Sequence, residues 1–112
     1  MSTFKSFGLA RPVFQGVKSA GYHKPSKIQA SAIPIACDRK DLIGCAQTGT
    51  GKTAAFVLPM LDRLIRRKHK KGRRFIRGLV VVPTRELALQ VTDAVNTYGR
   101  HTRLSVLSVF GG

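Results

Sequence analysis

The stretch Ala46-Gln47-Thr48-Gly49-Thr50-Gly51-Lys52-Thr53 has the residue types and the spacing that bind the phosphates of a nucleotide. Gly49 and Gly51 let the backbone turn so that successive N–H groups point into one concavity, which suits an anion. Lys52 can reach the outer phosphates as a point charge, and the Thr53 hydroxyl is a hard oxygen ligand of the kind that Mg²⁺ prefers. We therefore predict a phosphate-binding loop. The alternative is a flexible glycine turn followed by an incidental Lys-Thr pair.

The segments on either side of this loop are those that a phosphate-binding loop requires. An apolar run at 42–46 predicts a buried strand that carries Cys45, and the residues after the loop have helical spacing. The loop departs from the strict pattern at Ala46, where that pattern has glycine. The helix is predicted to run to about Arg67. Its inward face is predicted to carry Phe56, Met60, Leu61 and Leu64.

The rest of the chain predicts further alternation of strands and helices. Residues 78–82 and 104–110 are short apolar runs typical of buried parallel strands, and residues 85–98 predict a helix between them. Two helices are predicted before the loop, one at 12–20 and one that Ser26 caps and Pro34 restarts or kinks. The predicted fold class is α/β, a parallel sheet with flanking helices and right-handed crossovers.

We predict an N-terminal arm with helices at 1–41 and the first part of a nucleotide-binding domain at 42–112. A parallel sheet of about three strands leaves edges that normally have neighbours, so the domain is expected to be incomplete.

The composition points to a basic, folded protein that binds polyanions. Against 20 Lys and Arg the chain has five acids among 112 residues, which gives a formal charge of +15, and nucleic acid is the first candidate partner. Hydrophobic residues make up 43% of the chain, which favours a folded core. Cys37 and Cys45 have no metal-like spacing and are expected to be reduced thiols. With no secretory signal and no run of membrane-spanning length, we expect a soluble, cytoplasmic protein without a membrane partner.

Four motifs in order resemble a known family. They are residues 21–29 (Gly-Tyr-His-Lys-Pro-Ser-Lys-Ile-Gln), residues 46–53, residues 83–88 (Pro-Thr-Arg-Glu-Leu-Ala) and Gly111-Gly112. They are similar to the Q motif, motif I, motif Ia and the GG motif of DEAD-box ATP-dependent RNA helicases of the bacterial type. The resemblance covers essentially the whole chain and implies the N-terminal part of the first RecA-like domain, a P-loop NTPase fold.

The resemblance implies roles for residues around ATP. Gln29 would read the adenine edge with its amide, since the amide has one donor group and one acceptor group, and Phe4 would stack on the adenine face. Without the resemblance, Gln29 is an ordinary helix glutamine and Phe4 a core aromatic. Lys52 and Thr53 would take the catalytic positions, and Thr53 would hold the Mg²⁺ that accompanies ATP. The nucleotide-binding set would be Phe4, Lys24, Gln29, Ala46, Gln47, Thr48, Gly49, Thr50, Gly51, Lys52 and Thr53.

The resemblance also implies an RNA contact at a predicted strand end. A hydroxyl, a guanidinium and helix N–H groups at 84–85 suit an RNA phosphate, whereas the alternative is that Thr84 caps the helix and Arg85 is solvated. The RNA-binding set would be Pro83, Thr84, Arg85, Gly111 and Gly112. The basic run at 63–77, with nine of the chain's 20 basic residues, is predicted to lie far from these residues as an auxiliary RNA contact or a solvated loop.

The sequence lacks other parts of that family's pattern. It has no Asp-Glu-Ala-Asp segment, no Ser-Ala-Thr motif and no second RecA-like domain. We therefore expect ATP hydrolysis and local unwinding of RNA duplexes in a complete enzyme and an inactive chain here. The alternatives are a truncated RNA-binding remnant without an ATP cycle and an unrelated P-loop ATPase. The resemblance names ribosomal and RNA-degradation complexes as candidate assemblies, and nothing indicates a homo-oligomer.

Overall fold

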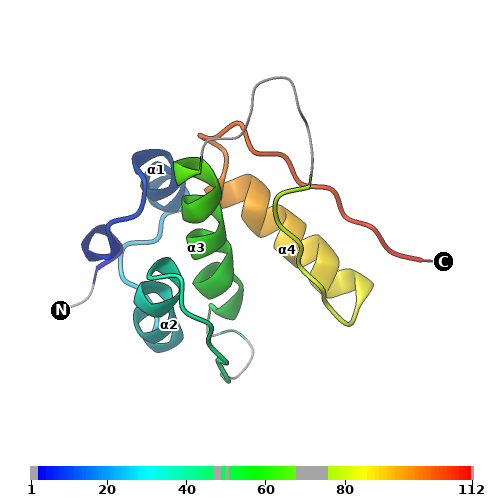
Figure 1. Ribbon diagram of the computed structural model, residues 1–112, viewed down its shortest axis with the longest axis horizontal. Helices are drawn as coiled ribbons and strands as arrows, with labels where there is room; N and C mark the ends of the chain where they lie inside the picture. The colour runs from blue at the N-terminus through cyan, green and yellow to red at the C-terminus, as the bar shows by residue number, and fades with distance from the viewer. Residues whose placement is uncertain (1–2, 47–48, 50, 68–75, 112) are drawn as a thin grey trace.

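The computed structural model describes residues 3–46, 49, 51–67 and 76–111, and these form four α-helices and one short 3-10 helix (Figure 1). The central helix, α3, lies between α2 and α4, and α1 packs across α3 and α4. None of the helices in this part of the chain is long and apolar enough to cross a bilayer. The elements are η1 (Lys5–Phe7), α1 (Arg11–Ser19), α2 (Lys27–Cys37), α3 (Lys52–Arg66) and α4 (Arg85–Tyr98).

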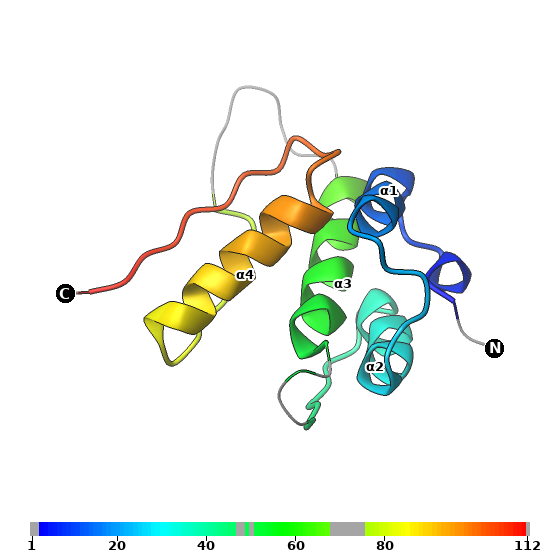
Figure 2. The same cartoon turned by 180° about the vertical axis from the view of Figure 1, so that it is seen from behind.

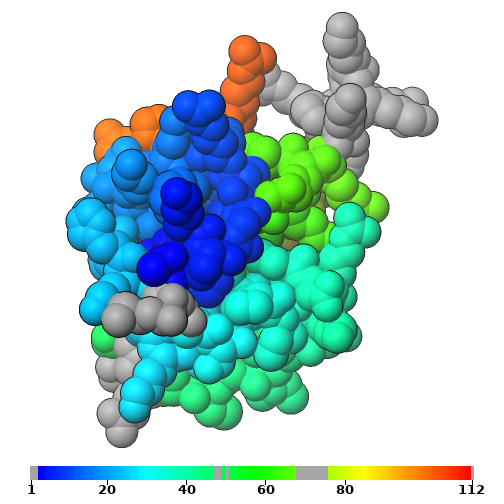
Figure 3. Space-filling model, turned by 90° about the vertical axis from the view of Figure 1, so that its left-hand side faces the viewer, coloured from blue at the N-terminus to red at the C-terminus, as the bar shows by residue number. Residues whose placement is uncertain are grey.

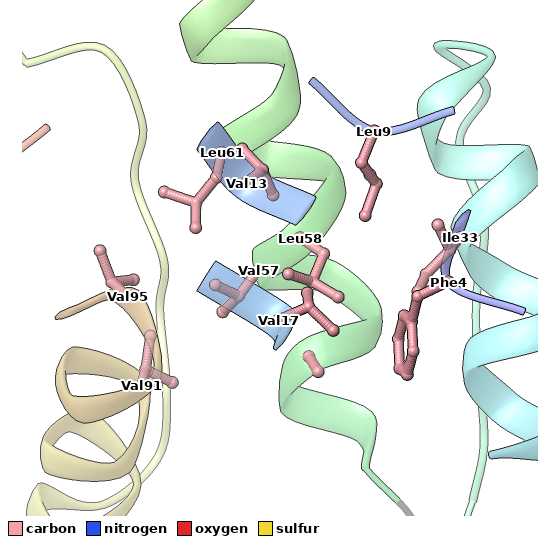
Figure 4. Packing of buried hydrophobic residues seen from close by; sticks show 11 residues of the cluster. Phe4, Leu9, Val13, Val17, Ile33, Val57, Leu58, Leu61, Val91 and Val95 are labelled. Carbon is pink, nitrogen blue, oxygen red and sulfur yellow. The ribbon is translucent and has the colours of Figure 1, made fainter. Parts of the chain in front are cut away.

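The hydrophobic core is built around α3 (Figure 4). Val57, Leu58 and Leu61 recur at helical spacing and are buried against apolar side chains from the other helices. The core takes residues from both sides of residue 41, including Phe4, Leu9, Val13, Val17, Ile33, Val91 and Val95. The predicted inward face of α3 is confirmed at Leu61 and wrong at Phe56, which is 40% exposed. The helix is turned by about one position from the expected face, so that Val57 points inward in place of Phe56.

Helix α2 continues through Pro34 to Cys37, so the predicted restart at this residue is wrong, and the alternative of a kink stays a prediction. Proline removes one backbone hydrogen bond, the one to the carbonyl of Ala30, and Pro34 lies in the last turn where few further bonds depend on it. The start of α2 is as predicted, because the Ser26 hydroxyl accepts a hydrogen bond from the backbone N–H of Gln29.

Helices α1 and α4 approach each other at Gly16. A Cβ atom at this position would lie 2.0 Å from the backbone oxygen of Tyr98, so only glycine allows the observed distance between the two helices. The ring of Tyr98 packs against Tyr22, with 6.1 Å between their centroids. Burial, with a smaller contribution from Tyr22, raises the pKa of Tyr98 to about 12, so its hydroxyl stays protonated at neutral pH.

The N-terminal arm, residues 3–10, is held against α3 by Asp62 and Arg66. The carboxylate of Asp62 is buried and accepts the backbone N–H of Ala10 at 2.6 Å and the Nε–H of Arg66 at 3.0 Å. Arg66 also donates from Nη2 to the carbonyl of Gly8 at 2.7 Å. Figure 3 shows the arm lying on the surface beside α1 and α2. The two charged side chains therefore fasten the arm to the end of α3.

We predict that Asp62→Asn destabilises the fold by about 2 kcal/mol, because charged hydrogen bonds to Arg66 and the arm are weakened in a buried position. Asp38→Asn is the matched control, since the Asp38–Lys40 pair is exposed and such pairs contribute about 0–1 kcal/mol. Urea unfolding followed by circular dichroism measures both. Equal losses for the two variants would contradict the role given to Asp62.

The predicted parallel sheet is not confirmed, because none of the residues that the structure describes is in a β-strand. Residues 78–82 and 104–110 run as extended segments, and the latter returns along α4 (Figures 1 and 2). Val80, Val82, Leu104 and Val106 pack against the helical core. The alternate side chains face solvent: Leu79 is 81%, Val81 83%, Leu107 85% and Val109 83% exposed.

Residues 78–82 and 104–110 are extended but do not form strands, because a strand is completed by hydrogen bonds to a neighbouring strand. The apolar runs predicted strands buried on both faces, but only the inner row of each segment packs on the core. No backbone hydrogen bonds join the segments within the described residues. The predicted burial at 42–46 is wrong: Ile43 is 94% exposed and Cys45 is also exposed. These residues have strand character but lack the covering layer that would bury them.

Candidate functional site

The start of α3 has the geometry of an anion site. Gly51 is the residue before the helix and has φ 85°, and Gly49 has φ 82°, both in the left-handed region that favours glycine. Lys52, the first helical residue, is exposed, and Thr53 follows it at a partly buried position. The positive end of the helix dipole therefore lies beside the exposed side chain of Lys52. Gln47, Thr48 and Thr50 lie outside the described residues.

Gln29 joins α2 to this loop. Its side chain is 6% exposed; Oε1 accepts the backbone N–H of Ser26 at 2.9 Å, and Nε2 donates to the carbonyl of Gly51 at 3.2 Å. The first bond belongs to the capping box of α2, and the second spans 22 positions of sequence. An amide has a second hydrogen on nitrogen and a second lone pair on oxygen, so these bonds still leave one donor and one acceptor. The reading of adenine by Gln29 stays a prediction.

The other residues predicted to bind the nucleotide lie in different environments. Phe4 is 3% exposed and packs edge-to-face on Phe7, with centroids 5.7 Å apart, within the hydrophobic core. This is the core position named as the alternative for Phe4, and stacking on a base would require the ring to leave the core. Lys24 is exposed and Ala46 is partly buried. Of this set, the structure joins Gln29 and Gly51 by a direct bond.

The residues predicted to bind RNA come together at the start of α4. The Thr84 hydroxyl accepts the N–H of Leu87 at 3.2 Å, which is the helix cap named as its alternative role. Arg85 donates from Nη2 to the carbonyl of Gly111 at 3.0 Å, so these two residues predicted to bind RNA are in contact. Pro83 is exposed next to them, and Gly112 lies outside the described residues.

Phe110 is a residue at this place that the sequence analysis did not single out. The guanidinium carbon of Arg85 lies 4.7 Å from the centroid of the Phe110 ring. The sequence feature that could have indicated Phe110 is its position directly before Gly111 and Gly112.

The starts of α3 and α4 lie at the same end of the molecule, and α3 ends at the opposite end (Figures 1 and 2). The described residues at these two starts, Gly51 to Thr53 and Thr84 to Arg85, therefore share one end. Among the described members of the basic run, Arg66 bonds Asp62 and Gly8, and Arg77 donates to the carbonyls of Leu64 and Arg67. Residues 68–75 of this run lie outside the described residues, and its role in RNA binding stays a prediction.

A cavity of about 320 Å³ lies at the far ends of α2 and α3 and is lined by Arg39, Arg63 and Arg66 together with Cys37 and Asp62. Burial, and next the Asp62 carboxylate, raise the pKa of the Cys37 thiol, so it stays protonated rather than becoming a reactive thiolate. Because the cavity lies at the far ends of α2 and α3, it is separate from the loop at the start of α3. The part of the chain that the structure describes has no group of His, Cys, Asp or Glu that could hold a metal ion.

Comparisons with known proteins agree on one family. The family model DEAD/DEAH box helicase matches residues 26–112. The chain is 46% identical over its whole length to the DEAD-box ATP-dependent RNA helicase CshA of Bacillus cereus and covers 20% of that protein. It is 45% identical to the ATP-dependent RNA helicase DHH1 of Vanderwaltozyma polyspora, with 99% of this chain and 22% of the relative covered. The chain therefore spans about a fifth of the length of these curated relatives.

Two solved helicase structures share the fold of this chain. The RNA helicase Prp28 from Chaetomium thermophilum, bound to ADP, matches all of this chain and 27% of its own, with a TM-score of 0.88 and 38% identity. Dbp5 from S. cerevisiae, bound to RNA and ADP BeF3, matches 92% of this chain and 26% of its own, with a TM-score of 0.80 and 34% identity. With the glycine loop, the Gln29–Gly51 bond and the Arg85–Gly111 contact already in place, this chain belongs to the DEAD/DEAH box helicase family.

Proposed function

We propose that this chain is the N-terminal part of a cytoplasmic ATP-dependent RNA helicase and that it supplies the phosphate cradle for ATP and one RNA contact. The observation that carries the proposal is the hydrogen bond between Gln29 and Gly51, which joins the segment at 21–29 to the glycine loop. Hydrolysis and local unwinding of RNA duplexes are proposed for a complete protein, because the chain spans 20% of its relative CshA.

The nucleotide part of the proposal rests on the start of α3. An exposed Lys52 can pair with the outer phosphates, and the first N–H groups of the helix can donate to the same oxygens. The hydroxyl of Thr53 with phosphate oxygens is a hard donor set that fits Mg²⁺ arriving with ATP, where the ion would neutralise phosphate charge. The relative Prp28, whose structure has ADP bound, shares this fold.

The RNA part of the proposal rests on the start of α4. Arg85 and the helix N-terminus can bind a phosphate oxygen, and Gly111 allows the backbone to come close to it. Such contacts position a nucleic acid strand without reading its bases. The relative Dbp5 has been solved with RNA and ADP BeF3, which supports this class of ligand.

Hydrolysis of ATP by this chain alone is expected to stay at background. Phosphoryl transfer requires a placed Mg²⁺, a positioned water and an arginine finger together, and the sequence has no Asp-Glu-Ala-Asp segment to supply the carboxylates. RNA-stimulated release of phosphate that disappears in Lys52→Ala would contradict this expectation.

Nucleotide binding to the chain tests the proposal directly. We expect ATP to bind more tightly than GTP, because the guanine edge reverses donor and acceptor opposite Gln29. A mismatched buried amide costs about 1–3 kcal/mol, or roughly tenfold or more in affinity. Lys52→Ala should abolish most of the binding, whereas Lys27→Ala removes an equal charge from an exposed position at the start of α2 and should change it little. Calorimetry measures all of these constants.

The formal charge of +15 favours one alternative, an RNA-binding remnant without an ATP cycle. Binding of RNA by a chain that takes up neither ATP nor GTP would select this alternative. Equal affinities for ATP and GTP, or an unchanged preference in Gln29→Ala, would refute the role of Gln29 alone.

A further inference from the structure

We propose that Phe110 is a positioning residue for RNA binding: its ring holds the guanidinium of Arg85 at the start of α4, where an RNA phosphate would lie. This inference rests on the RNA contact proposed above for Arg85. It is carried by the stacking of Arg85 on the ring and by the way the chain brings Phe110 there.

Arg85 occupies a position that the helix itself disfavours. It is the first residue of α4, where the helix dipole is positive and a cation is repelled. An anion at this point is attracted both by the helix N-terminus and by the guanidinium. A basic residue that opposes its own helix therefore needs a partner to hold it in place before an anion arrives.

Phe110 and Gly111 supply that partner on two sides. The guanidinium carbon lies 4.7 Å from the ring centroid of Phe110, within the range of a cation–π contact, and Nη2 donates to the carbonyl of Gly111 at 3.0 Å. A guanidinium that lies over a ring and also donates to a carbonyl is restricted by two contacts at once. Binding of a phosphate then requires less ordering of this long side chain.

The extended segment 104–110 delivers the ring to this place. After α4 the segment returns along the helix (Figure 2). The hydroxyls of Thr92 in α4 and Ser108 in the segment are in contact. Leu104 and Val106 fix its inner side on the core. Phe110, which is 46% exposed, therefore reaches the first residue of α4 as the last side chain of the segment.

The test uses the 112-residue chain and a short oligouridylate as the probe. Phe110→Leu keeps the apolar volume and removes the ring, and it is expected to weaken binding about two- to fivefold, the range for a cation–π contact near solvent. Phe110→Tyr keeps the ring and should bind like the wild type. In the background of Arg85→Ala, Phe110→Leu should cause no further loss, because the ring acts through the guanidinium.

A second measurement needs no RNA. The ring current of Phe110 should shift the side-chain Nε–H resonance of Arg85 in nuclear magnetic resonance spectra, and this shift should vanish in Phe110→Leu and persist in Phe110→Tyr. A resonance that does not respond to Phe110→Leu overturns the inference whether or not RNA binds. A normal shift in a chain that binds no oligouridylate overturns the RNA contact of Arg85, and with it the positioning role. An equal loss of affinity with and without Arg85 also overturns the inference.

Discussion

Replacing Gly16 by alanine is expected to lower the melting temperature of this chain by roughly 10 °C, although the same change in an exposed helix would stabilise it by about 1 kcal/mol. The new methyl group would lie 2.0 Å from the oxygen, 2.7 Å from the carbonyl carbon and 3.0 Å from the Cα atom of Tyr98. All three are backbone atoms at the end of α4, so no side chain can turn away. Helix α1 would have to move from α4, and overpacking of this kind costs about 1–3 kcal/mol or more.

Gln15→Ala is the matched control, because Gln15 is exposed on the same helix and alanine there improves helix propensity slightly. Thermal unfolding followed by circular dichroism at 222 nm, a helix signal, compares the three chains. A higher melting temperature for Gly16→Ala than for the wild type would show that helix propensity outweighs the contact. It would mean that α1 does not pack on α4 as described.

Replacing Gly51 by alanine is expected to abolish nucleotide binding and to destabilise the chain. Gly51 has φ 85°, where a side chain costs about 1–2 kcal/mol. A Cβ atom would also lie 2.3 Å from Nε2 of Gln29 and 3.3 Å from Oγ of Ser26. Gln29 would have to leave the carbonyl of Gly51, and the bond between α2 and the loop would be lost. We expect a total loss of stability of about 2–3 kcal/mol, since the strain and the broken buried hydrogen bond add.

Gly49→Ala separates these two effects. Gly49 has nearly the same backbone angle, φ 82°, but apart from its chain neighbours none of the described residues has an atom within 4 Å of the position of its Cβ. This variant should carry the backbone strain alone and be the more stable of the two. Urea unfolding gives the difference, and calorimetry with ATP shows whether binding follows it. If Gly49→Ala is as unstable as Gly51→Ala, the contact with Gln29 does not matter to the fold.

The helices of this chain could be predicted from the sequence because their signals are local. Residues 85–98 were predicted from periodicity between a threonine and a glycine, and α4 has the same bounds. Ser26 was predicted as a cap, and its hydroxyl accepts the N–H three residues on. Which side of a helix is buried is not local. Phe56 was placed inward by its spacing, whereas the packing of α3 on its neighbours turns Val57 inward.

In the candidate site too, the features set by local sequence could be predicted and those set by distant contacts could not. The glycines of the loop and the lysine after them could be recognised, because anion binding imposes these residue types within a few positions. The Gln29–Gly51 bond and the place of Phe110 under Arg85 could not, since both join residues more than 20 positions apart. The sheet was predicted from short apolar runs typical of strands buried on both faces, and the structure buries only one face of each segment. Strand pairing needs backbone hydrogen bonds to a neighbouring strand, and none joins these segments within the described residues. Burial of the outward row needs a covering layer, and Leu107 and Val109 are exposed.

The exposed apolar side chains on the extended segments affect how the protein behaves in solution. Apolar side chains and unpaired backbone on extended segments favour pairing with another copy, and a formal charge of +15 on each copy opposes it. Mobile ions shorten the reach of this repulsion, from about 10 Å at 0.1 M ionic strength to about 3 Å at 1 M. A high-salt wash, the usual way to strip nucleic acid from a basic protein, would therefore also remove the barrier to aggregation.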